Sequence, residues 1–442
     1  MKSLGIDLGT TKVAVIVYDQ HSGLITALNA PHGAALDTGD PDAGEQDAGK
    51  IFDCVYSLIG QLPEDLRREI KAIGITGQMH SLMLVKNKAF SPLITWQDHR
   101  CGKEMIQRFN AKSSLTLREG FGGTTLARMA ENNELGNWEK AATVSDMLGA
   151  VIRGDGKIVT DPTHAASWGI YDRENGCWNF AALKALDIPR EILPEIMPSG
   201  AVTGKVSAEF AGKFQIPAEA AVVNAIGDNQ ASIMGTGKDF AGELYLTLGT
   251  GAQLSMVVEE KLENLPENLE LRPFPGNRYL LVSAPLCGGA AFAWLADTVN
   301  RFRTELGESA IPRGEMLDKL DEAGFRYLTG HGESEIRIAP HFLGERHAPE
   351  IRGEVRGLTL SNAGPGELAS ALALGIIRNL KSGFPAKELA SRKKVVGSGN
   401  AVRLVKSIRF AIEKEFGLPL ELADGSEEAA VGAARQAVES VK

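Results

Sequence analysis

Two apolar runs separated by a short polar turn open the chain. Residues 3–8 and 12–18 are rich in Val, Ile and Leu, and Gly9, Thr10 and Thr11 lie between them. Runs of β-branched residues around so short a turn predict the two strands of a hairpin.

Farther along, the spacing of apolar residues alternates between that of strands and that of helices. Residues 24–28 and 70–76 are short apolar runs typical of strands, whereas residues 50–59 repeat apolar positions at helical spacing. Further helices are expected at Ser114–Arg118, Leu126–Asn132, Asp146–Ile152, Gly289–Thr304, Gly314–Glu322, Pro365–Leu380, Ala401–Phe416 and Glu427–Val441. Strands mixed with helices in this way predict an α/β fold built in layers.

The opening pattern returns in part near the middle of the chain. Residues 246–251 again run from an apolar strand into a Gly/Thr turn, and residues 254–258 form the second apolar run. A second series of strands is expected to begin near Ala221. Because one strand–turn–strand unit occurs twice, the sequence predicts a duplicated core. We therefore expect two domains, residues 1–236 and residues 237–442.

Composition and charge narrow the classes of partner. The chain has 442 residues, 43% of them apolar, and a formal net charge of −9 without a basic run, so nucleic acid is not an expected partner. Its four cysteines are scattered, which argues against a disulfide framework or a zinc site. The chain opens on a strand rather than a signal peptide, and no apolar stretch has the length of a membrane span. We expect a cytoplasmic protein that binds no membrane, and a homodimer is left open.

The two Gly/Thr turns have the chemistry that a polyphosphate needs. Glycine lets the backbone approach a ligand closely, and consecutive N–H groups and threonine hydroxyls donate to phosphate oxygens. Such donors occur in the first turn and again at Gly249, Thr250 and Gly251. The sequence thus predicts a nucleotide held between two related domains.

Asp7 and Lys12 flank the first turn. A carboxylate beside a phosphate makes chemical sense when a cation lies between them, and Mg²⁺ binds one or two carboxylates while keeping several waters. The alternative is an aspartate that only orders its own turn; the presence of a second turn favours the cation. Lys12 has two equal interpretations, a point charge that reaches phosphate or a solvated strand residue.

Asp228 follows an apolar run and precedes a segment of small residues. An aspartate at such a strand–helix junction is often a helix cap. The alternative is a general base aimed at a substrate hydroxyl, which phosphoryl transfer to an alcohol requires.

Two further strand-like segments end in side chains that suit a sugar. The first ends at Gln78, Met79 and His80, and the second at Trp96 and Asp98. Ligands of α/β proteins usually bind where strands end, and amide, imidazole and carboxylate groups form hydrogen bonds with hydroxyls. A lone histidine is more often structural. Read together with the aspartate at the strand–helix junction, these side chains favour a hydroxyl-rich ligand.

Gly397, Ser398, Gly399 and Asn400 follow a short apolar strand in the last third of the chain. The glycines would let a flat adenine or ribose lie against the backbone, and the asparagine side chain would bond its edge. Gly289, before a predicted helix, would form the opposite wall. The alternative for each segment is a tight turn with a helix cap.

Taken together, these motifs resemble those of the FGGY carbohydrate kinase family, in the superfamily of actin, hexokinase and heat-shock-chaperone ATPases. The resemblance spans nearly the whole chain, and the sugar motif is similar to that of the xylulokinases and sedoheptulokinases. The matching segments are Gly5–Thr11 and Leu248–Gly251 for phosphate, Gly77–His80 and Thr95–Cys101 for sugar, Gly227–Asn229 for the base, Leu343–His347, Gly397–Asn400 for adenosine, and Glu428–Ala434 for the closing helix.

The resemblance implies two actin-like, ribonuclease-H-like ATPase domains with an interdomain cleft. It also implies ATP- and Mg²⁺-dependent phosphorylation of a primary hydroxyl of a sugar. By position, Asp228 would be the catalytic base and Asp7 the carboxylate near Mg²⁺. The residues that would face the sugar are Met79, His80, Asp98 and Asn229.

Two positions depart from the family pattern. Relatives often carry Lys or Arg seven residues after the first aspartate, whereas this chain has Ala14 there and Lys12 two positions earlier. His99 stands where relatives commonly have Gly, and it would narrow or re-tune the sugar pocket.

The sequence therefore predicts a ketose kinase, with sedoheptulose as the first expected substrate. The nearest alternatives are family members specific for xylulose, ribulose, gluconate or glycerol. A non-enzymatic ATP-switch protein of chaperone or actin type would share the first phosphate turn but would not need the sugar motif. An inactive sugar-binding relative would not need to retain Asp7 and Asp228.

Overall fold

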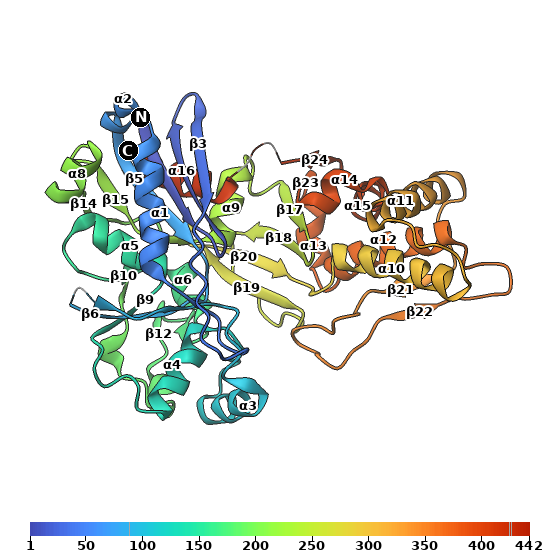
Figure 1. Ribbon diagram of the computed structural model, residues 1–442, viewed down its shortest axis with the longest axis horizontal. Helices are drawn as coiled ribbons and strands as arrows, with labels where there is room; N and C mark the ends of the chain where they lie inside the picture. Colours follow the sequence, from blue (N-terminus) through green and yellow to red (C-terminus); the bar gives the residue numbers. More distant parts are fainter. Residues whose placement is uncertain (88, 424, 426) are drawn as a thin grey trace. The chain divides into compact units, whose positions relative to one another are not determined.

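The computed structural model describes residues 1–87, 89–423, 425 and 427–442. Contacts within the chain divide it into two compact units. The first unit consists of Met1–Thr236, Pro273–Asn277 and Gly425–Lys442, and the second consists of Gly237–Arg272 and Arg278–Asp424. Each unit is built around its own sheet (Figure 1).

A seven-stranded sheet forms the centre of the first unit. Its strands are β1 (Lys2–Leu8), β2 (Lys12–Asp19), β3 (Gly23–Pro31), β5 (Ile70–Gly77), β14 (Val202–Lys205), β15 (Ala221–Val223) and β16 (Ile226–Gly227). The order across the sheet is β14-β15-β5-β1-β2-β3, and β16 also pairs with β5. Strands β1, β2 and β3 are antiparallel, whereas β5 runs parallel to β1 and β15 runs parallel to β5.

The sheet of the second unit repeats this topology. Its strands are β17 (Glu243–Leu248), β18 (Ala252–Val258), β19 (Leu269–Phe274), β20 (Arg278–Ser283), β23 (Lys394–Ser398) and β24 (Leu420–Leu422), in the order β19-β20-β18-β17-β23-β24. Strands β17, β18 and β20 are antiparallel neighbours, while β23 runs parallel to β17 and β24 to β23. The strand–turn–strand unit that occurs twice in the sequence thus belongs to two similar sheets. In each of them, three antiparallel strands are followed by two parallel ones.

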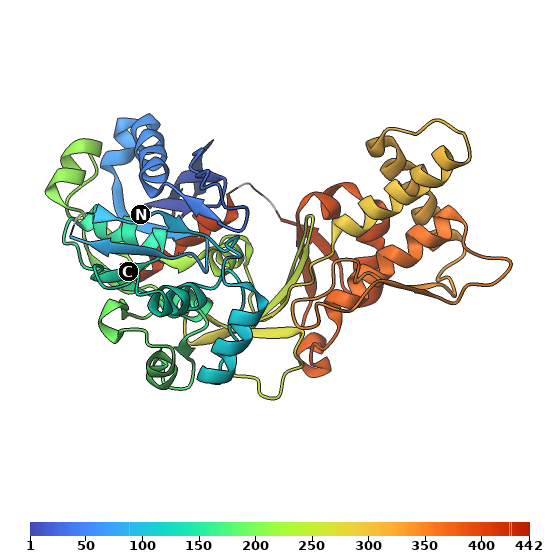
Figure 2. The same cartoon turned by 60° about the horizontal axis from the view of Figure 1, so that its bottom comes forward.

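Strand β1 buries both of its faces, each against a different helix. Leu4 and Ile6 belong to the core cluster that includes Ile51 of α1 (Ala48–Gln61). Ser3 precedes Leu4, so its side chain points to the opposite face, where Oγ donates to the carbonyl oxygen of Ala434, 2.8 Å away, in α16 (Glu428–Ser440). Because successive strand residues point to opposite faces, α1 and α16 cover opposite faces of the first sheet, as Figures 1 and 2 show.

Glycines let α16 approach the first sheet closely. A Cβ atom on Gly5 would lie 2.1 Å from the carbonyl oxygen of Ala430, and one on Gly74 would lie 1.9 Å from that of Ala433. These glycines therefore admit the helix backbone itself, and larger residues would push α16 away. The contacts place Gly425–Lys442 in the first unit, whereas the sequence predicts this segment in the second domain.

The remaining elements of the first unit surround the sheet. Its other helices are α2 (Glu64–Arg68), α3 (Gly102–Ser113), α4 (Gly122–Glu131), α5 (Val144–Arg153), α6 (Pro162–Ser167), α7 (Phe180–Ala185), α8 (Ala208–Phe214), α9 (Asp228–Thr236) and the 3₁₀ helix η1 (Arg190–Ile192). Its short strands are β4 (Glu45–Gln46), β6 (Met83–Lys86), β7 (Ala89–Phe90), β8 (Leu93–Ile94), β9 (Lys140–Ala142), β10 (Val159–Thr160), β11 (Tyr171–Asp172), β12 (Cys177–Trp178) and β13 (Glu195–Ile196). A separate apolar cluster around the buried Trp168 holds many of these elements together.

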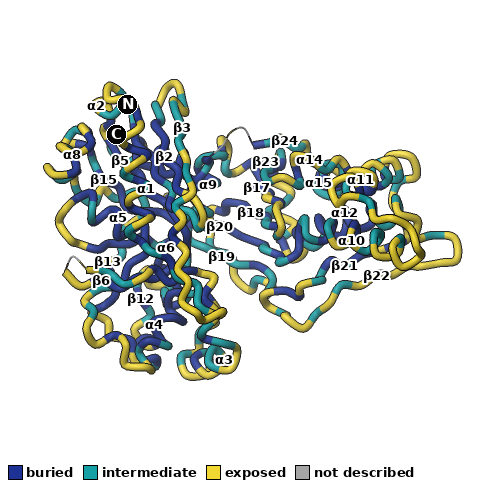
Figure 3. Tube along the Cα trace, viewed as in Figure 1, coloured by how far each residue is buried: buried dark blue, intermediate teal, exposed yellow. Residues whose placement is uncertain are grey.

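Helices pack around the sheet of the second unit, and Figure 3 shows the buried strands and the exposed loops. The helices are α10 (Gly289–Glu305), α11 (Arg313–Gly330), α12 (Pro365–Lys381), α13 (Ala386–Ala390), α14 (Asn400–Leu404) and α15 (Lys406–Phe416), and a small hairpin is formed by β21 (Arg337–Ala339) and β22 (Glu354–Arg356). Leu372 and Ile376 of α12 lie in one core cluster with Leu246 of β17. Within the described parts of the chain, no helix is both long and apolar enough to cross a membrane.

Three predicted elements differ from those observed. Residues 114–118 are not helical, because α3 ends at the left-handed Ser114 and the side chain of Asn110 binds the backbone N–H and carbonyl of Leu117, at 2.7 and 3.0 Å. The helix predicted at 401–416 is two helices, because Val405 is extended.

The break in the helix predicted at 401–416 has a further cause, which lies in α11. The carboxylate of Asp321 accepts the backbone N–H groups of Lys406 and Ser407, each at 2.8 Å, and so starts a new helix there. The third difference concerns the strand at Ala221, which was expected to begin the second core. It is β15, and it pairs in parallel with β5 of the first sheet.

Candidate active site

Three strand ends meet at one edge of the first sheet. In the parallel pairing of β1 with β5, Leu8 faces Gly77, and in that of β16 with β5, Gly227 faces Gly77. Asp7 near the end of β1, Gln78 after β5 and Asp228 after β16 are therefore neighbours along this edge. The carboxyl edge of parallel strands is where α/β proteins bind ligands.

The carboxylate of Asp7 is unusual in its surroundings. Its Oδ1 atom is buried and has no hydrogen-bond partner among the residues that the structure describes. Burial, and then the nearby charges of Asp228 and Glu427, raise the pKa of Asp7 to about 7, and the charge of Lys12 offsets this only in part. Asp7 thus combines two negatively charged neighbours with a buried oxygen that lacks a hydrogen-bond partner among the described residues, and a cation beside it would be favourable.

Lys12, at the start of β2, is held by an ion pair. Its Nζ atom lies 2.6 and 2.9 Å from the two carboxylate oxygens of Glu427, which immediately precedes α16. Asn29 on β3 donates to the same carboxylate at 2.8 Å. From the sequence, Lys12 is either a phosphate contact or a solvated residue, and neither of these two partners could be predicted.

The first Gly/Thr turn is linked by hydrogen bonds to the predicted sugar residues. The indole Nε1–H of Trp96 donates to Oγ1 of Thr10 at 3.0 Å. The side-chain amide of Gln46 donates to the Thr10 carbonyl at 2.7 Å and accepts from Gln78 Nε2 at 3.0 Å. Gln46 therefore connects the first Gly/Thr turn to the Gln78–His80 segment. Nothing in the sequence around Gln46 predicts this role. The carbonyl of Gly9 lies 3.3 Å from Nε2 of His32.

His80 is fixed in both backbone and ring. Its φ angle is +68°, and its Nδ1 lies 2.6 Å from the carbonyl oxygen of Ser167. Because a carbonyl can only accept, Nδ1 carries a proton, and in the neutral ring Nε2 is then an acceptor. The ring stacks on Phe121 with centroids 4.7 Å apart. Met79 is buried, and its Sδ would lie 2.8 Å from a Cβ atom on Gly227.

The carboxylate of Asp98 is engaged by neighbouring loops. It accepts the N–H of Gly44 at 3.1 Å and Nε–H of Arg100 at 2.7 Å, and only 1% of its side chain is exposed. Arg100 also pairs with Glu45 at 2.7 Å. These bonds hold the loop that carries Gln46. His99, which follows Asp98 in the chain, is more than half exposed, and its Nδ1 lies 3.0 Å from Glu119 Oε2.

In the second unit, the second Gly/Thr turn meets the start of α10. The turn lies between β17 and β18, and the N–H groups of Gly288 and Gly289 donate to the carbonyls of Thr250 and Gly249 at 3.0 and 2.8 Å. A Cβ atom on Gly289 would lie 2.5 Å from the Gly249 carbonyl oxygen. Two glycine-containing segments thus approach one another through their backbones, and Gly251 closes the turn through its carbonyl, 3.1 Å from the Gly249 N–H.

The last glycine motif lies beside the same turn. Ser398 ends β23, next to β17, and its Oγ lies 2.8 Å from Thr247 Oγ1. Gly397 is buried in that strand. Gly399 has a φ of +88°, and a Cβ atom there would lie 2.5 Å from the Leu248 carbonyl oxygen. Asn400 is the exposed first residue of α14. The predicted phosphate and adenosine motifs of the second unit therefore lie together.

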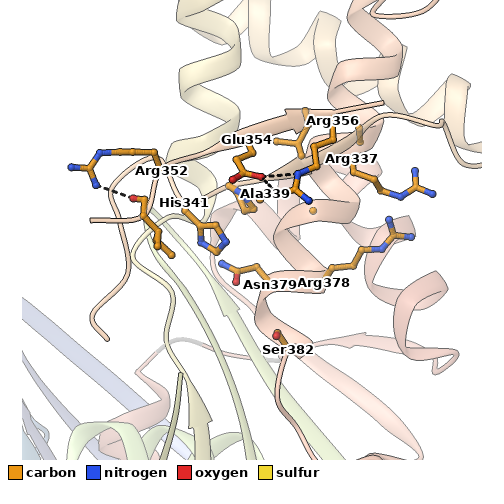
Figure 4. Close-up of a pocket in the computed structure, with 14 residues that line it drawn as sticks. Arg337, Ala339, His341, Arg352, Glu354, Arg356, Arg378, Asn379 and Ser382 are labelled. Carbon is orange, nitrogen blue, oxygen red and sulfur yellow. Dashed lines mark hydrogen bonds and ion pairs between the residues drawn. The ribbon is translucent and has the colours of Figure 1, made fainter. Parts of the chain in front are cut away.

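A separate pocket of about 640 Å³ lies in the second unit between the β21–β22 hairpin and α12 (Figure 4). Its lining mixes apolar residues such as Ile338 with charged ones, of which Glu354 pairs with Arg356. Behind it, Glu345 accepts from His341 Nδ1 at 3.0 Å and from Asn379 at 2.9 Å. No residue of the predicted phosphate or adenosine motifs lines this pocket.

The residues at the edge of the first sheet fit Mg²⁺ better than a metal held by protein alone. Among the described residues, no three His, Cys, Asp or Glu side chains converge as a complete metal site. Mg²⁺ needs only one or two carboxylates, because it keeps several waters and binds phosphate oxygens. The Oδ1 of Asp7, unpaired among the described residues, would be one such ligand.

Comparisons with solved structures identify the fold. The chain resembles a xylulose kinase structure from Brucella ovis (TM-score 0.82, 22% identity, covering all of this chain and 90% of that one). It also resembles Plasmodium falciparum glycerol kinase with ADP (TM-score 0.81, 21% identity, 100% and 90% covered). The fold is thus the actin-like, ribonuclease-H-like fold in two domains, in the form found in carbohydrate kinases.

The family follows from the sequence comparison. Residues 3–235 match the model of the N-terminal domain of the FGGY family of carbohydrate kinases, and the chain belongs to that family. It is 28% identical to sedoheptulokinase from Homo sapiens over 98% of this chain and 96% of the relative. It is 26% identical to xylulose kinase from Lactococcus lactis over 88% and 78%. The chain is therefore a carbohydrate kinase, as the sequence predicted.

Proposed function

We propose that this carbohydrate kinase transfers the γ-phosphoryl group of ATP to a primary hydroxyl of a ketose, with sedoheptulose as the first candidate. The observation that carries the proposal is the meeting of Asp7, the Gln78–His80 segment and Asp228 at one sheet edge. The similarity to human sedoheptulokinase over nearly the whole length supports the choice of sugar. Xylulose is the second candidate, because xylulose kinases are also among the relatives.

In this proposal, Asp228 is the catalytic base. It starts α9 directly after β16 and is close enough to Asp7 to raise the pKa of that carboxyl group. A carboxylate at this place accepts the proton of the attacking hydroxyl as the phosphoryl group is transferred. From the strand–helix junction it would orient the attacking hydroxyl, and such positioning contributes much of the catalysis in phosphoryl transfer.

The proposed sugar contacts are assigned to the same edge. In the neutral form of the His80 ring, Nε2 would accept a hydrogen bond from a sugar hydroxyl, because Nδ1 donates to the Ser167 carbonyl. Asn229, beside the base, and the half-exposed Trp96 complete the proposed sugar surface together with Gln78 and Met79. Asp98 would act by positioning the loops at the sugar site, since its carboxylate already accepts hydrogen bonds from Gly44 and Arg100.

Mg²⁺ and ATP are assigned to groups that the structure holds in place. Asp7 would bind Mg²⁺, which neutralises phosphate charge when bound. The backbone and hydroxyls of Gly9, Thr10 and Thr11 would donate to phosphate oxygens. In the second unit the residues proposed to contact the nucleotide are Gly249, Thr250, Gly251, Gly289, Gly397, Ser398, Gly399 and Asn400. A cytoplasmic location fits the four free thiols.

The direct test is a coupled assay of ADP release with Mg·ATP and each of sedoheptulose, xylulose, ribulose, gluconate and glycerol. We expect the highest kcat/KM with sedoheptulose. A clear preference for another sugar would replace the substrate but keep the kinase. Absence of turnover on any of them, with ATP still bound, would favour an ATP-switch protein or an inactive relative.

The base is tested with Asp228→Asn and the sugar that turns over fastest. We expect kcat to fall by about 10²–10⁴-fold, with ATP binding retained. The control is Asp47→Asn, because Asp47 caps α1 through its Oδ1 and asparagine caps a helix equally well. Full activity of Asp228→Asn would refute the assignment of the base.

A further inference from the structure

One peptide group a residue upstream of Asp228 is hydrogen bonded at both of its polar atoms. This group joins Ile226 to Gly227. Thr76 Oγ1 donates to the carbonyl oxygen of Ile226 at 2.7 Å, and the N–H of Gly227 donates to Thr163 Oγ1 at 2.8 Å. Both threonine side chains are fully buried. One peptide plane is thus clamped by two hydroxyls from different elements, β5 and α6.

Asp161 determines the direction of the hydrogen bond at Thr163. The hydroxyl of Thr163 donates to Asp161 Oδ1 at 2.6 Å, which leaves its lone pairs for the N–H of Gly227. The same Oδ1 accepts the backbone N–H groups of Thr163 and His164, at 3.0 and 2.9 Å. Ser199 donates to the other oxygen. A buried carboxylate with this many donors fixes the rotamer of the threonine beside it.

The strand pairing of the backbone at this point is short. Strand β16 has only two residues, and its pairing with β5 ends at Gly227. Asp228 is already the first residue of α9. Met79 fills the space where a Cβ of Gly227 would lie, so a longer side chain cannot anchor the turn. The two hydroxyls, together with the pairing to β5, therefore fix the orientation of the Ile226–Gly227 peptide, from which the chain continues into Asp228.

We propose that Thr76 and Thr163, the latter oriented by Asp161, are positioning residues that aim the carboxylate of Asp228 at the sugar hydroxyl. This inference rests on the proposed role of Asp228 as the base. None of the three side chains needs to touch the substrate. Their effect is on the geometry of proton acceptance, so their loss reduces kcat more than it changes the KM for the sugar.

The test compares Thr163→Val, which keeps the shape and removes the hydroxyl, with Thr163→Ser, which restores the hydroxyl. We expect kcat to fall about 10–100-fold in Thr163→Val, since a displacement near 1 Å costs about that much. The KM for the sugar should change less than threefold, and Thr163→Ser should recover most of kcat. Thr76→Val should behave as Thr163→Val does.

The matched control is Thr124→Val. Thr124 is also fully buried and donates to a main-chain carbonyl, that of Arg118, at 2.8 Å, but not in the segment before Asp228. We expect it to lower the melting temperature and leave kcat unchanged. If Thr124→Val reduces kcat as much as Thr163→Val does, or if Thr163→Ser fails to recover activity, the positioning role is wrong. If Thr163→Val does not fold, Thr76→Val decides the question by the same criteria.

A measurement without turnover separates this inference from the proposed function. Hydrogen exchange at the Gly227 amide should be slow in the wild-type protein and much faster in Thr163→Val. Equal exchange in the two proteins would overturn the clamp even in an active kinase. Lack of activity with every sugar would instead refute the proposed function, while fast exchange in the variant would still support the clamp.

Discussion

The ammonium group of Lys12 lies 2.6 Å from the Glu427 carboxylate, although 415 positions separate the two residues in the sequence. The pair connects the end of the first Gly/Thr turn to the residue before α16. Its two sides are unequal, because 48% of the Lys12 side chain is exposed but only 3% of the Glu427 side chain. Removing the lysine leaves a buried carboxylate with Asn29 as its hydrogen-bond donor.

This asymmetry predicts unequal effects of the two single substitutions. Lys12→Met should lower the free energy of unfolding by about 1–3 kcal/mol, because an uncompensated buried charge is costly. Glu427→Gln should cost less, and the double variant should recover part of the loss of Lys12→Met. A double-mutant cycle from urea unfolding measures these terms.

The exposed pair of Lys205 and Glu219 provides the control for this cycle. Both of its side chains are more than 60% exposed, so Lys205→Met should change stability by less than about 1 kcal/mol. If Lys12→Met is no more destabilising than Lys205→Met, the ion pair at α16 contributes nothing beyond a surface contact.

Asp7 predicts a pH dependence of stability. Burial first, and then Asp228 and Glu427, raise its pKa to about 7 in the folded protein. A carboxyl group that binds its proton more tightly when folded lowers the free energy of unfolding as the pH rises from about 4 to about 7. Asp7→Asn removes this loss, so the variant should be more stable than the wild type at pH 8 by at most about 4 kcal/mol, with little difference near pH 4.

Urea unfolding of both proteins at a series of pH values measures this difference. Asp146 and Asp161 also have pKa values raised by burial, to about 7 and about 6, but they contribute equally to both proteins. Asp19→Asn is the control, because hydrogen bonds from the N–H groups of His21 and Ser22 lower the pKa of Asp19. Its effect should be constant above pH 5. A constant difference for Asp7→Asn from pH 4 to 8 would contradict the shifted pKa.

Much of the candidate site could be predicted because its residues end strands that are apolar runs in the sequence. Asp7, Gln78 and Asp228 each mark the end of such a run, and parallel strands end at the same edge. Gln46 and Glu427 could not be found in this way. Gln46 lies in a two-residue strand after a loop, and its partners Thr10 and Gln78 come from other segments.

The fold shows the same limit at its last helix. The apolar and small residues of α16 predict a helix, which is observed, but not the sheet on which it packs. That choice depends on Gly5 and Gly74, whose missing side chains admit the helix backbone. Residues 114–118 show the opposite case, since their local helical pattern is overruled by the left-handed Ser114 and by Asn110.

Trp96 predicts a link between the sugar side and the phosphate turn. Trp96→Phe removes the indole donor to Thr10 Oγ1 but keeps an aromatic face. A single hydrogen bond is worth about 0.5–1.5 kcal/mol, so the KM for Mg·ATP should rise about 2–10-fold, with the melting temperature nearly unchanged. Steady-state kinetics of the coupled assay, with ATP varied at saturating sugar, provides the measurement.

Thr10→Val removes the acceptor of the same bond and serves as the second arm. If the Trp96–Thr10 bond causes the effect, the double variant should be no worse than the poorer single variant. Trp138→Phe, in the peripheral cluster of the first unit, is the control and should leave the KM for ATP unchanged. Additive effects of Trp96→Phe and Thr10→Val would show that the two side chains act separately.

Gly399 predicts a strict requirement at the proposed adenosine motif. Its φ of +88° disfavours any L side chain, and a Cβ would lie 2.5 Å from the Leu248 carbonyl oxygen. Gly399→Ala should therefore lower the free energy of unfolding by about 1–3 kcal/mol and weaken nucleotide binding, because the β23–α14 turn must move away from β17. Calorimetric titration with ADP and urea unfolding measure the two effects.

The control is Gly314→Ala, in the first turn of α11, where a Cβ meets open space. This substitution should be neutral or slightly stabilising. Equal ADP affinity in Gly399→Ala and the wild type would place the nucleotide away from this turn.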